Sequence, residues 1–239
     1  MCAGQRDSCD DSYDDFCDDS CDDSCGIYIQ RGERVIAIID YKAGNAPSVR
    51  LAAEKLGYDA KLVRDAKSLE DATHIILPGV GSAGATMDSL AEMKIINALE
   101  DAVLHRKVFF LGICVGLQVL FEHSAEDDAA CLGWLEGKVI KFNASKVRVP
   151  QMGWNQVNFR NKTPGVLAED DYFYFVNSYH AQPKNEADIW GVASYDGHFV
   201  AAVHRKNIYG TQFHAEKSGE AGLELLGGFF ALGKAAKVC

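Results

Sequence analysis

Short apolar runs alternate with segments of helical periodicity along the first half of the chain. Residues 35–40 are almost all apolar, which predicts a strand buried on both faces. Pro47 is placed to begin a helix that Gly57 ends. Helical spacing over residues 86–105 predicts one long helix. Two more strands are predicted, at 61–64 and 74–77.

The second half of the chain has shorter strands separated by turn residues. From Gly137 onward this pattern predicts antiparallel hairpins, and residues 219–232 predict a closing helix. The alternation of strand and helix in the first half predicts right-handed crossovers. Together the two halves of the chain predict an α/β fold of the flavodoxin-like type. Such a fold is an open, mostly parallel sheet flanked by helices, here with appended antiparallel strands.

The N-terminal segment differs from the rest in charge and repetition. The formal charge is −10, and nine aspartates against Arg6 place −8 of it in residues 1–25, where a Ser-Cys-Asp-Asp unit recurs. Such a sequence cannot offset the entropy lost on ordering, so residues 1–34 are predicted to be a disordered tail and 35–239 one domain. The nearly neutral body offers no basic surface for nucleic acid, and no apolar run is long enough to span a membrane.

The eight cysteines are unevenly distributed. Five lie in the tail, where a metal or redox role is conceivable, but the spacing is C-x3-C and no histidine accompanies it. Three widely separated cysteines remain in the body, Cys114, Cys131 and Cys239, too few for a disulfide scaffold. We predict a cytoplasmic protein without a metal or a cofactor.

Cys114 lies where an apolar strand meets a helical pattern. Gly112 and Gly116 flank it in the G-x-nucleophile-x-G arrangement of a strained strand-to-helix turn. A helix predicted at 117–122 would direct its N-terminal partial charge at the sulfur and favour the thiolate. A buried structural cysteine is the alternative interpretation.

A base and a carboxylate follow one hundred residues later, in Gln-Phe-His214-Ala-Glu216. A cysteine nucleophile needs a base, and the base needs a group that fixes its tautomer. In an extended segment the side chains of His214 and Glu216 would project to the same side. The three residues therefore form a candidate catalytic triad.

Pro78-Gly79-Val80-Gly81 closes an earlier strand. These residues could form an ordinary tight turn, or they could present a backbone N–H to the oxyanion formed when Cys114 attacks an amide, with the N–H of Val115 as the second donor.

The order and spacing of these motifs resemble class I, triad-type glutamine amidotransferases, and within them the glutaminase subunits of imidazole glycerol phosphate synthase. The resemblance covers about residues 35–230. It rests on Leu77-Pro-Gly-Val-Gly81, Leu111-Gly-Ile-Cys-Val-Gly-Leu-Gln118, Gln151-Met-Gly-Trp-Asn155 and Gln212-Phe-His-Ala-Glu-Lys-Ser218. It implies hydrolysis of glutamine through a cysteine thioester and transfer of ammonia to a cyclase partner that makes imidazole glycerol phosphate in histidine biosynthesis. It also implies a peptide flip in 79–80, driven by the partner.

Family position implies further site residues. Gln118, Glu126, Ser178 and Tyr179 would hold the amino-acid end of glutamine, and Asn45, Gln151 and Lys217 would lie near the partner. Taken alone, Gln118 could face solvent and Glu126 could lie in a solvated loop.

The sequence departs from the family pattern at three positions near the motifs. Ala215 replaces a common proline, and Gln151 and Asn177 replace common histidines. None belongs to the triad, but the changes leave open a paralogous subunit that feeds ammonia to a different acceptor enzyme. A non-catalytic partner with the same fold is disfavoured because all three triad residues are present.

Overall fold

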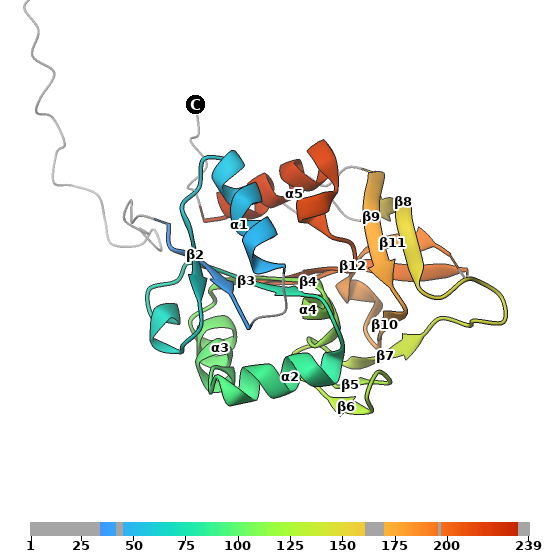
Figure 1. The fold of residues 1–239 in the computed structure, drawn as a ribbon, viewed down its shortest axis with the longest axis horizontal. Coiled ribbons are helices and arrows are strands. Elements are labelled where there is room, and N and C mark those ends of the chain that lie inside the picture. Colours follow the sequence, from blue (N-terminus) through green and yellow to red (C-terminus); the bar gives the residue numbers. More distant parts are fainter. Residues whose placement is uncertain (1–33, 42–44, 161–169, 196, 234–239) are drawn as a thin grey trace, which may run out of the picture. The chain divides into compact units, whose positions relative to one another are not determined.

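The computed structural model describes residues 34–41, 45–160, 170–195 and 197–233, and Figure 1 shows the domain that they form. The predicted tail lies outside these ranges except for Arg34. Its guanidinium donates to the Phe230 carbonyl and lies over the Tyr58 ring, 5.9 Å from the centroid, so this residue belongs to the domain.

Five parallel strands form one end of the sheet. Their order is β2 (Ala60–Val63), β1 (Ile36–Ile39), β3 (His74–Gly79), β4 (Phe109–Cys114) and β13 (Ile208–Thr211). Every described residue of β1 and β3 is buried, as expected for strands covered on both faces. This is the flavodoxin-like order, and the predicted fold class is confirmed. In such sheets, ligand sites lie beyond the carboxyl ends of the strands.

Helices cover both faces of these strands (Figure 1). One face carries α1 (Ala46–Lys55) and α5 (Gly219–Ala231), and the other carries α2 (Ala83–Glu92) and α3 (Ile96–Glu100). Gly57, at φ +79°, follows α1 as predicted. The single helix predicted at 86–105 is wrong: Lys94 adopts φ 53° between α2 and α3, and a π-helical turn at Asp101–His105 follows.

The remaining strands extend the sheet with mostly antiparallel pairs. Beyond β13 come β12 (His198–Arg205), β10 (Tyr179–Pro183), β7 (Gly137–Lys141), β5 (His123–Ser124) and β6 (Ala129–Ala130). β11 (Ile189–Ser194) pairs with β12 and with β8 (Gln151–Phe159), which pairs in turn with β9 (Asp171–Asn177). The appended hairpins are confirmed.

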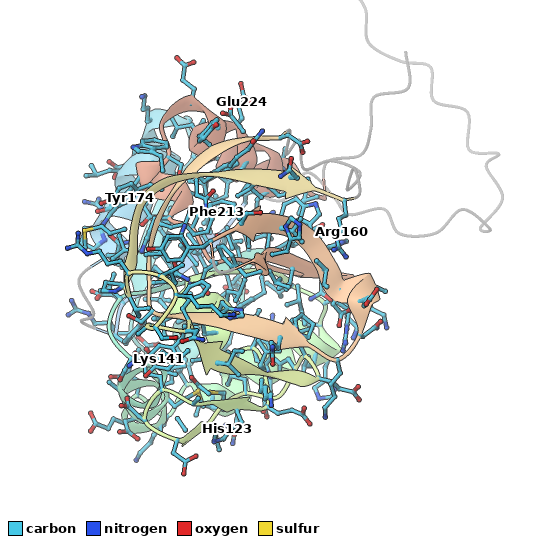
Figure 2. All side chains as sticks on the ribbon, turned by 90° about the vertical axis from the view of Figure 1, so that its right-hand side faces the viewer. His123, Lys141, Arg160, Tyr174, Phe213 and Glu224 are labelled. Carbon is cyan, nitrogen blue, oxygen red and sulfur yellow. The ribbon has the colours of Figure 1, made fainter. Side chains whose placement is uncertain are left out.

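Aromatic side chains fill the space between β9 and the main sheet. Phe213 packs on Phe173 with ring centroids 4.1 Å apart, and Figure 2 shows it inside the domain. The outer side of β9 differs, because Tyr172 is 55% exposed. Burial therefore alternates along β9, with Phe173, Phe175 and Asn177 buried. None of the helices in the described ranges is long and apolar enough to cross a membrane.

Candidate active site

Cys114 ends β4 in a strained turn. Its φ of 56° and ψ of −107° lie where L-residues are rarely found. A Cβ on Gly112 would lie 2.2 Å from the Gly116 carbonyl oxygen, and one on Gly116 would lie 2.0 Å from that of Leu77. The two glycines are therefore required for this turn. The helix after it, α4 (Val115–Gln118), begins two residues earlier than predicted and is only four residues long.

The register of the parallel strands brings the second candidate motif beside Cys114. Thr211 of β13 pairs with Ile113 of β4, so the chain beyond β13 runs next to the turn. His214 Nδ1 lies 2.8 Å from Glu216 Oε1. Their side chains are 2% and 0% exposed. Ala215–Lys217 is a 3-10 turn rather than the extended segment that we expected, and this turn still brings the carboxylate to the ring.

The electrostatics of His214 identify the roles of its two ring nitrogens. A carboxylate only accepts, so Nδ1 carries the proton toward Glu216 and Nε2 is left for the sulfur. Burial lowers the pKa of His214, but hydrogen bonds with the Cys114 side chain and with Glu216 outweigh it and raise this pKa to about 10. The imidazole is therefore a strong proton acceptor for the thiol.

Asn45 lies on the Nδ1 side of the His214 ring. Its Nδ2 donates to Glu216 Oε1 and lies 3.3 Å from His214 Nδ1. Asn45 is the N-cap residue of α1, yet its side chain makes no capping hydrogen bond. The side chain is buried and orients Glu216, which the sequence did not reveal because Asn at a helix start is ordinarily a cap.

A pocket of about 290 Å³ opens beside the sulfur and gathers most of the predicted residues. Its lining includes Val80, Cys114, Val115, Gln118, Glu126, Ser178, Tyr179, His214 and Lys217. Gly79 ends β3 next to this pocket and is the register partner of Cys114. These residues lie at or after the ends of β3, β4, β5, β9 and β13, so the fold itself assembles the site.

The two polar candidates at the far end of the pocket are held by backbone groups. Gln118 is buried, which excludes the solvent-facing alternative, and its Nε2 donates to the Tyr179 carbonyl at 3.1 Å. Glu126 Oε2 accepts from the Ala83 N–H at 3.2 Å at the start of α2. Desolvation raises the pKa of this half-buried carboxyl group. Glu126 is therefore half-buried and hydrogen-bonded to α2, and the solvated-loop alternative is wrong.

Two of the three predicted partner residues have internal side chains. Asn45 and Gln151 are buried, and Gln151 pairs directly with Asn177 across β8 and β9. Only Lys217 is exposed. The contacts seen for Asn45 are with the triad, so its role toward a partner stays a prediction, as does that of Gln151.

Gln212 contacts the sulfur and was missed by the sequence reasoning. Its Nε2 lies 3.7 Å from Cys114 Sγ, and the residue is fully buried. The available signal was its position two residues before His214, because alternate residues of an extended segment project to the same side.

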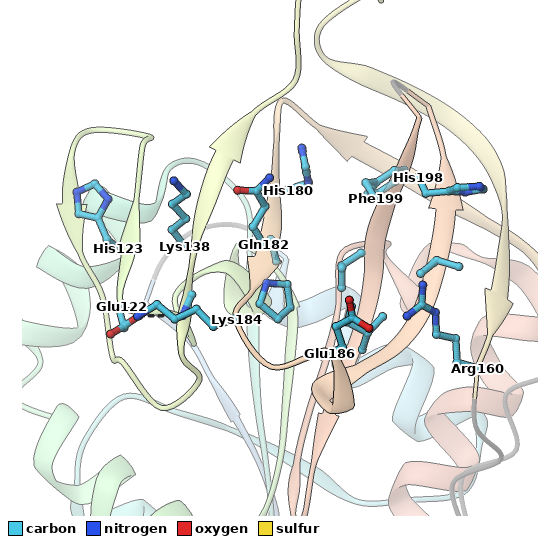
Figure 3. Close-up of a pocket in the computed structure, with 16 residues that line it drawn as sticks. Glu122, His123, Lys138, Arg160, His180, Gln182, Lys184, Glu186, His198 and Phe199 are labelled. Atoms are coloured by element: carbon cyan, nitrogen blue, oxygen red, sulfur yellow. Dashed lines mark hydrogen bonds and ion pairs between the residues drawn. The ribbon is translucent and has the colours of Figure 1, made fainter.

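A larger hollow of about 810 Å³ lies on the face of β7, β10, β11 and β12 (Figure 3). It contains none of the predicted site residues, and its Lys184 is paired with Glu122 at 2.8 Å. Among the described residues, no group of His, Cys, Asp or Glu has an arrangement that could hold a metal ion.

Comparison with known proteins identifies the family of this chain. The model of the class-I glutamine amidotransferase family matches residues 37–231. The imidazole glycerol phosphate synthase subunit HisH of Leptospira interrogans is 41% identical over 204 residues, covering 83% of this chain and all of that protein. The subunit of the same name from Bacillus subtilis is 38% identical, covering 85% and 99%.

Solved structures share the fold at lower identity. The structure of PurLQS from Thermotoga maritima has a TM-score of 0.67 at 20% identity, covering 83% of this chain and 98% of that one. The family match over most of the chain and the close relatives together lead to one conclusion: the chain belongs to the class-I glutamine amidotransferase family, among its HisH subunits.

Proposed function

We propose that this protein hydrolyses glutamine to glutamate and ammonia, as the glutaminase subunit of an imidazole glycerol phosphate synthase. The observation that supports this most is the meeting of Cys114, at the end of β4, with the buried His214–Glu216 pair that follows β13. A strained cysteine beside an oriented base is the arrangement of an activated thiol nucleophile.

The reaction proceeds through a thioester. His214 Nε2 takes the thiol proton, and Sγ attacks the side-chain amide carbon of glutamine. The tetrahedral intermediate collapses, the C–N bond breaks, and His214 returns the proton to the leaving ammonia. Water, deprotonated by the same base, then cleaves the thioester to glutamate.

The developing oxyanion would be stabilised by backbone donors. The N–H of Val115 and one from Gly79–Val80 are the candidates, because both segments border the pocket next to the sulfur. At the other end, Gln118, Glu126, Ser178 and Tyr179 would hold the ammonium and carboxylate of the substrate.

A cyclase subunit would receive the ammonia. An exposed apolar surface on the β8–β9 hairpin supports this, formed by Met152, Trp154 and Tyr172, which are 67%, 56% and 55% exposed. Met152 pairs with Val176, which lines the catalytic pocket, so the surface adjoins the site of ammonia release. Such a patch is typical of a protein interface. The cytoplasmic location stays a prediction.

Glutamate release should be measured for the wild type, Cys114→Ala and Trp154→Asp, with and without an imidazole glycerol phosphate synthase cyclase. We expect no activity in Cys114→Ala, and in Trp154→Asp a loss of the cyclase-dependent rate with basal hydrolysis retained. Absence of hydrolysis in the wild type under both conditions would refute the proposal. Hydrolysis that no cyclase stimulates would instead favour a paralogous subunit with a different acceptor enzyme.

A further inference from the structure

A buried chain of amide groups runs from the wall of the pocket to the sulfur of Cys114. Gln118 Nε2 donates to the Tyr179 carbonyl and to Gln212 Oε1, each at 3.1 Å. Gln212 Nε2 then lies 3.7 Å from Cys114 Sγ. The two glutamine side chains are almost completely buried, so solvent does not compete for these contacts.

The partners determine which end of each amide faces the sulfur. A backbone carbonyl can only accept, so the end of Gln118 at Tyr179 must be the NH₂ group. The same NH₂ group meets Gln212, which must therefore present its oxygen to Gln118. The opposite end of Gln212, which faces Sγ, is then its NH₂ group.

We propose that Gln212 is a further catalytic residue, a hydrogen-bond donor to the Cys114 thiolate, and that Gln118 is the positioning residue that fixes its orientation. The inference deepens the proposed function and rests on Cys114 being the nucleophile. It gives Gln118 a second role besides bordering the substrate pocket.

The contacts of the sulfur change with its protonation state. As a thiol, Sγ–H can donate to the Val176 carbonyl, 3.9 Å away. When the proton moves to His214 Nε2 that donor is lost, and the thiolate needs donors instead. Hydrogen bonds to an ionised group are roughly twice as strong as neutral ones, so the amide of Gln212 favours the thiolate over the thiol.

The test uses the full chain without glutamine. The rate of alkylation of Cys114 by iodoacetamide is followed against pH, with the Cys114 peptide quantified by mass spectrometry because the chain has eight cysteines. Gln212→Met keeps the length of the side chain and removes the donor. We expect its alkylation midpoint to lie about one pH unit higher, which is a tenfold lower rate at a fixed pH below the midpoint.

A matched control is available one residue away. Thr211 is equally buried, and its hydroxyl donates to the Phe213 carbonyl at 3.0 Å, with no contact to Sγ among the described hydrogen bonds. Thr211→Val should leave the midpoint where it is. Gln118→Met should raise the midpoint by less than Gln212→Met, and in the double variant it should add nothing, because Gln118 acts through Gln212.

An unchanged midpoint in Gln212→Met, or an equal shift in Thr211→Val, would overturn the inference. If Gln212→Met does not fold, Gln118→Met provides the test instead. An alkylation midpoint identical to that of the wild type would then contradict the proposal that Gln118 orients Gln212 toward the sulfur. Hydrolysis of glutamine by the wild type is measured separately. Its absence defeats the proposed function, whereas its presence with an unchanged kcat in Gln212→Met defeats this inference alone.

Discussion

Replacing Gly116 by alanine tests whether the turn at Cys114 depends on the absence of a side chain. The added Cβ would lie 2.0 Å from the Leu77 carbonyl oxygen, and real Cβ atoms essentially never come closer than 3.0 Å to another atom. The two backbones must therefore separate by about 1 Å. Leu77 belongs to β3, which ends at Gly79 beside Cys114, so the movement reaches the oxyanion donors and the nucleophile together.

The expected cost has two parts. Overpacking of a dense interior destabilises by about 1 to 3 kcal/mol. A misplacement of about 1 Å in a catalytic group lowers the rate roughly 100-fold. We therefore expect Gly116→Ala to unfold at lower urea concentration than the wild type and to lose most of its glutaminase kcat even where it is fully folded.

Gly227→Ala provides the control for the same chemical change. Gly227 lies within α5, and an added Cβ would have its nearest neighbour at 3.7 Å, an ordinary contact. Alanine there should stabilise the fold by about 0.5 to 1 kcal/mol, because it is the better helix former. Urea unfolding and glutamine hydrolysis would be measured on both variants. Full activity in Gly116→Ala, or equal damage in Gly227→Ala, would refute the steric argument.

Two further predictions concern buried histidines. Glu216→Gln should lower kcat roughly 10²- to 10⁴-fold and move the alkaline limit of the pH–rate profile to lower pH, because the neutral amide no longer supports the raised pKa of His214; a profile identical to the wild type would contradict this. Burial first, and then the charge of Arg34, lower the pKa of His74 in the folded protein to about 4. In the unfolded chain this histidine binds its proton near pH 6.5, so the free energy of unfolding falls as the pH drops from about 6.5 through 4. Urea unfolding across this pH range should show that the free energy of unfolding of His74→Phe falls by about 3 kcal/mol less than that of the wild type. Equal losses would show that His74 is not responsible.

The parts of the site that follow from local sequence could be predicted. Gly112 and Gly116 identify the turn at Cys114 because close backbone approach is a local requirement. Four of the five parallel strands and the hairpins were likewise visible in the hydrophobic pattern, whereas β13 was expected only within an antiparallel hairpin and not as a parallel neighbour of β4. Helix boundaries were less accurate, since the break at Lys94 and the short length of α4 depend on packing against the sheet.

The contacts that the supporting amides make could not be predicted, because they arise from strand register. Gln212 and Gln118 are 94 positions apart, and Asn45 and Glu216 are 171 apart. In the sequence each amide is an ordinary polar residue that would suit a surface or a helix cap. The spacing of Gln212 and His214 indicates a shared side, and the pairing of β13 with β4 then places Gln212 beside the sulfur.

The same register explains why stability and reactivity are linked in this protein. Gly79 pairs with Cys114 and Thr211 pairs with Ile113, so the segments after β3, β4 and β13 meet at one edge of the sheet. The strain at Cys114 is therefore borne by the parallel strands rather than by the short α4. Burying Asn45, Gln118 and Gln212 lowers stability unless every amide is hydrogen-bonded. Replacing Asn45 by an apolar residue of similar size removes a donor from the buried Glu216 carboxylate, so the variant should both unfold at lower urea concentration and hydrolyse glutamine more slowly.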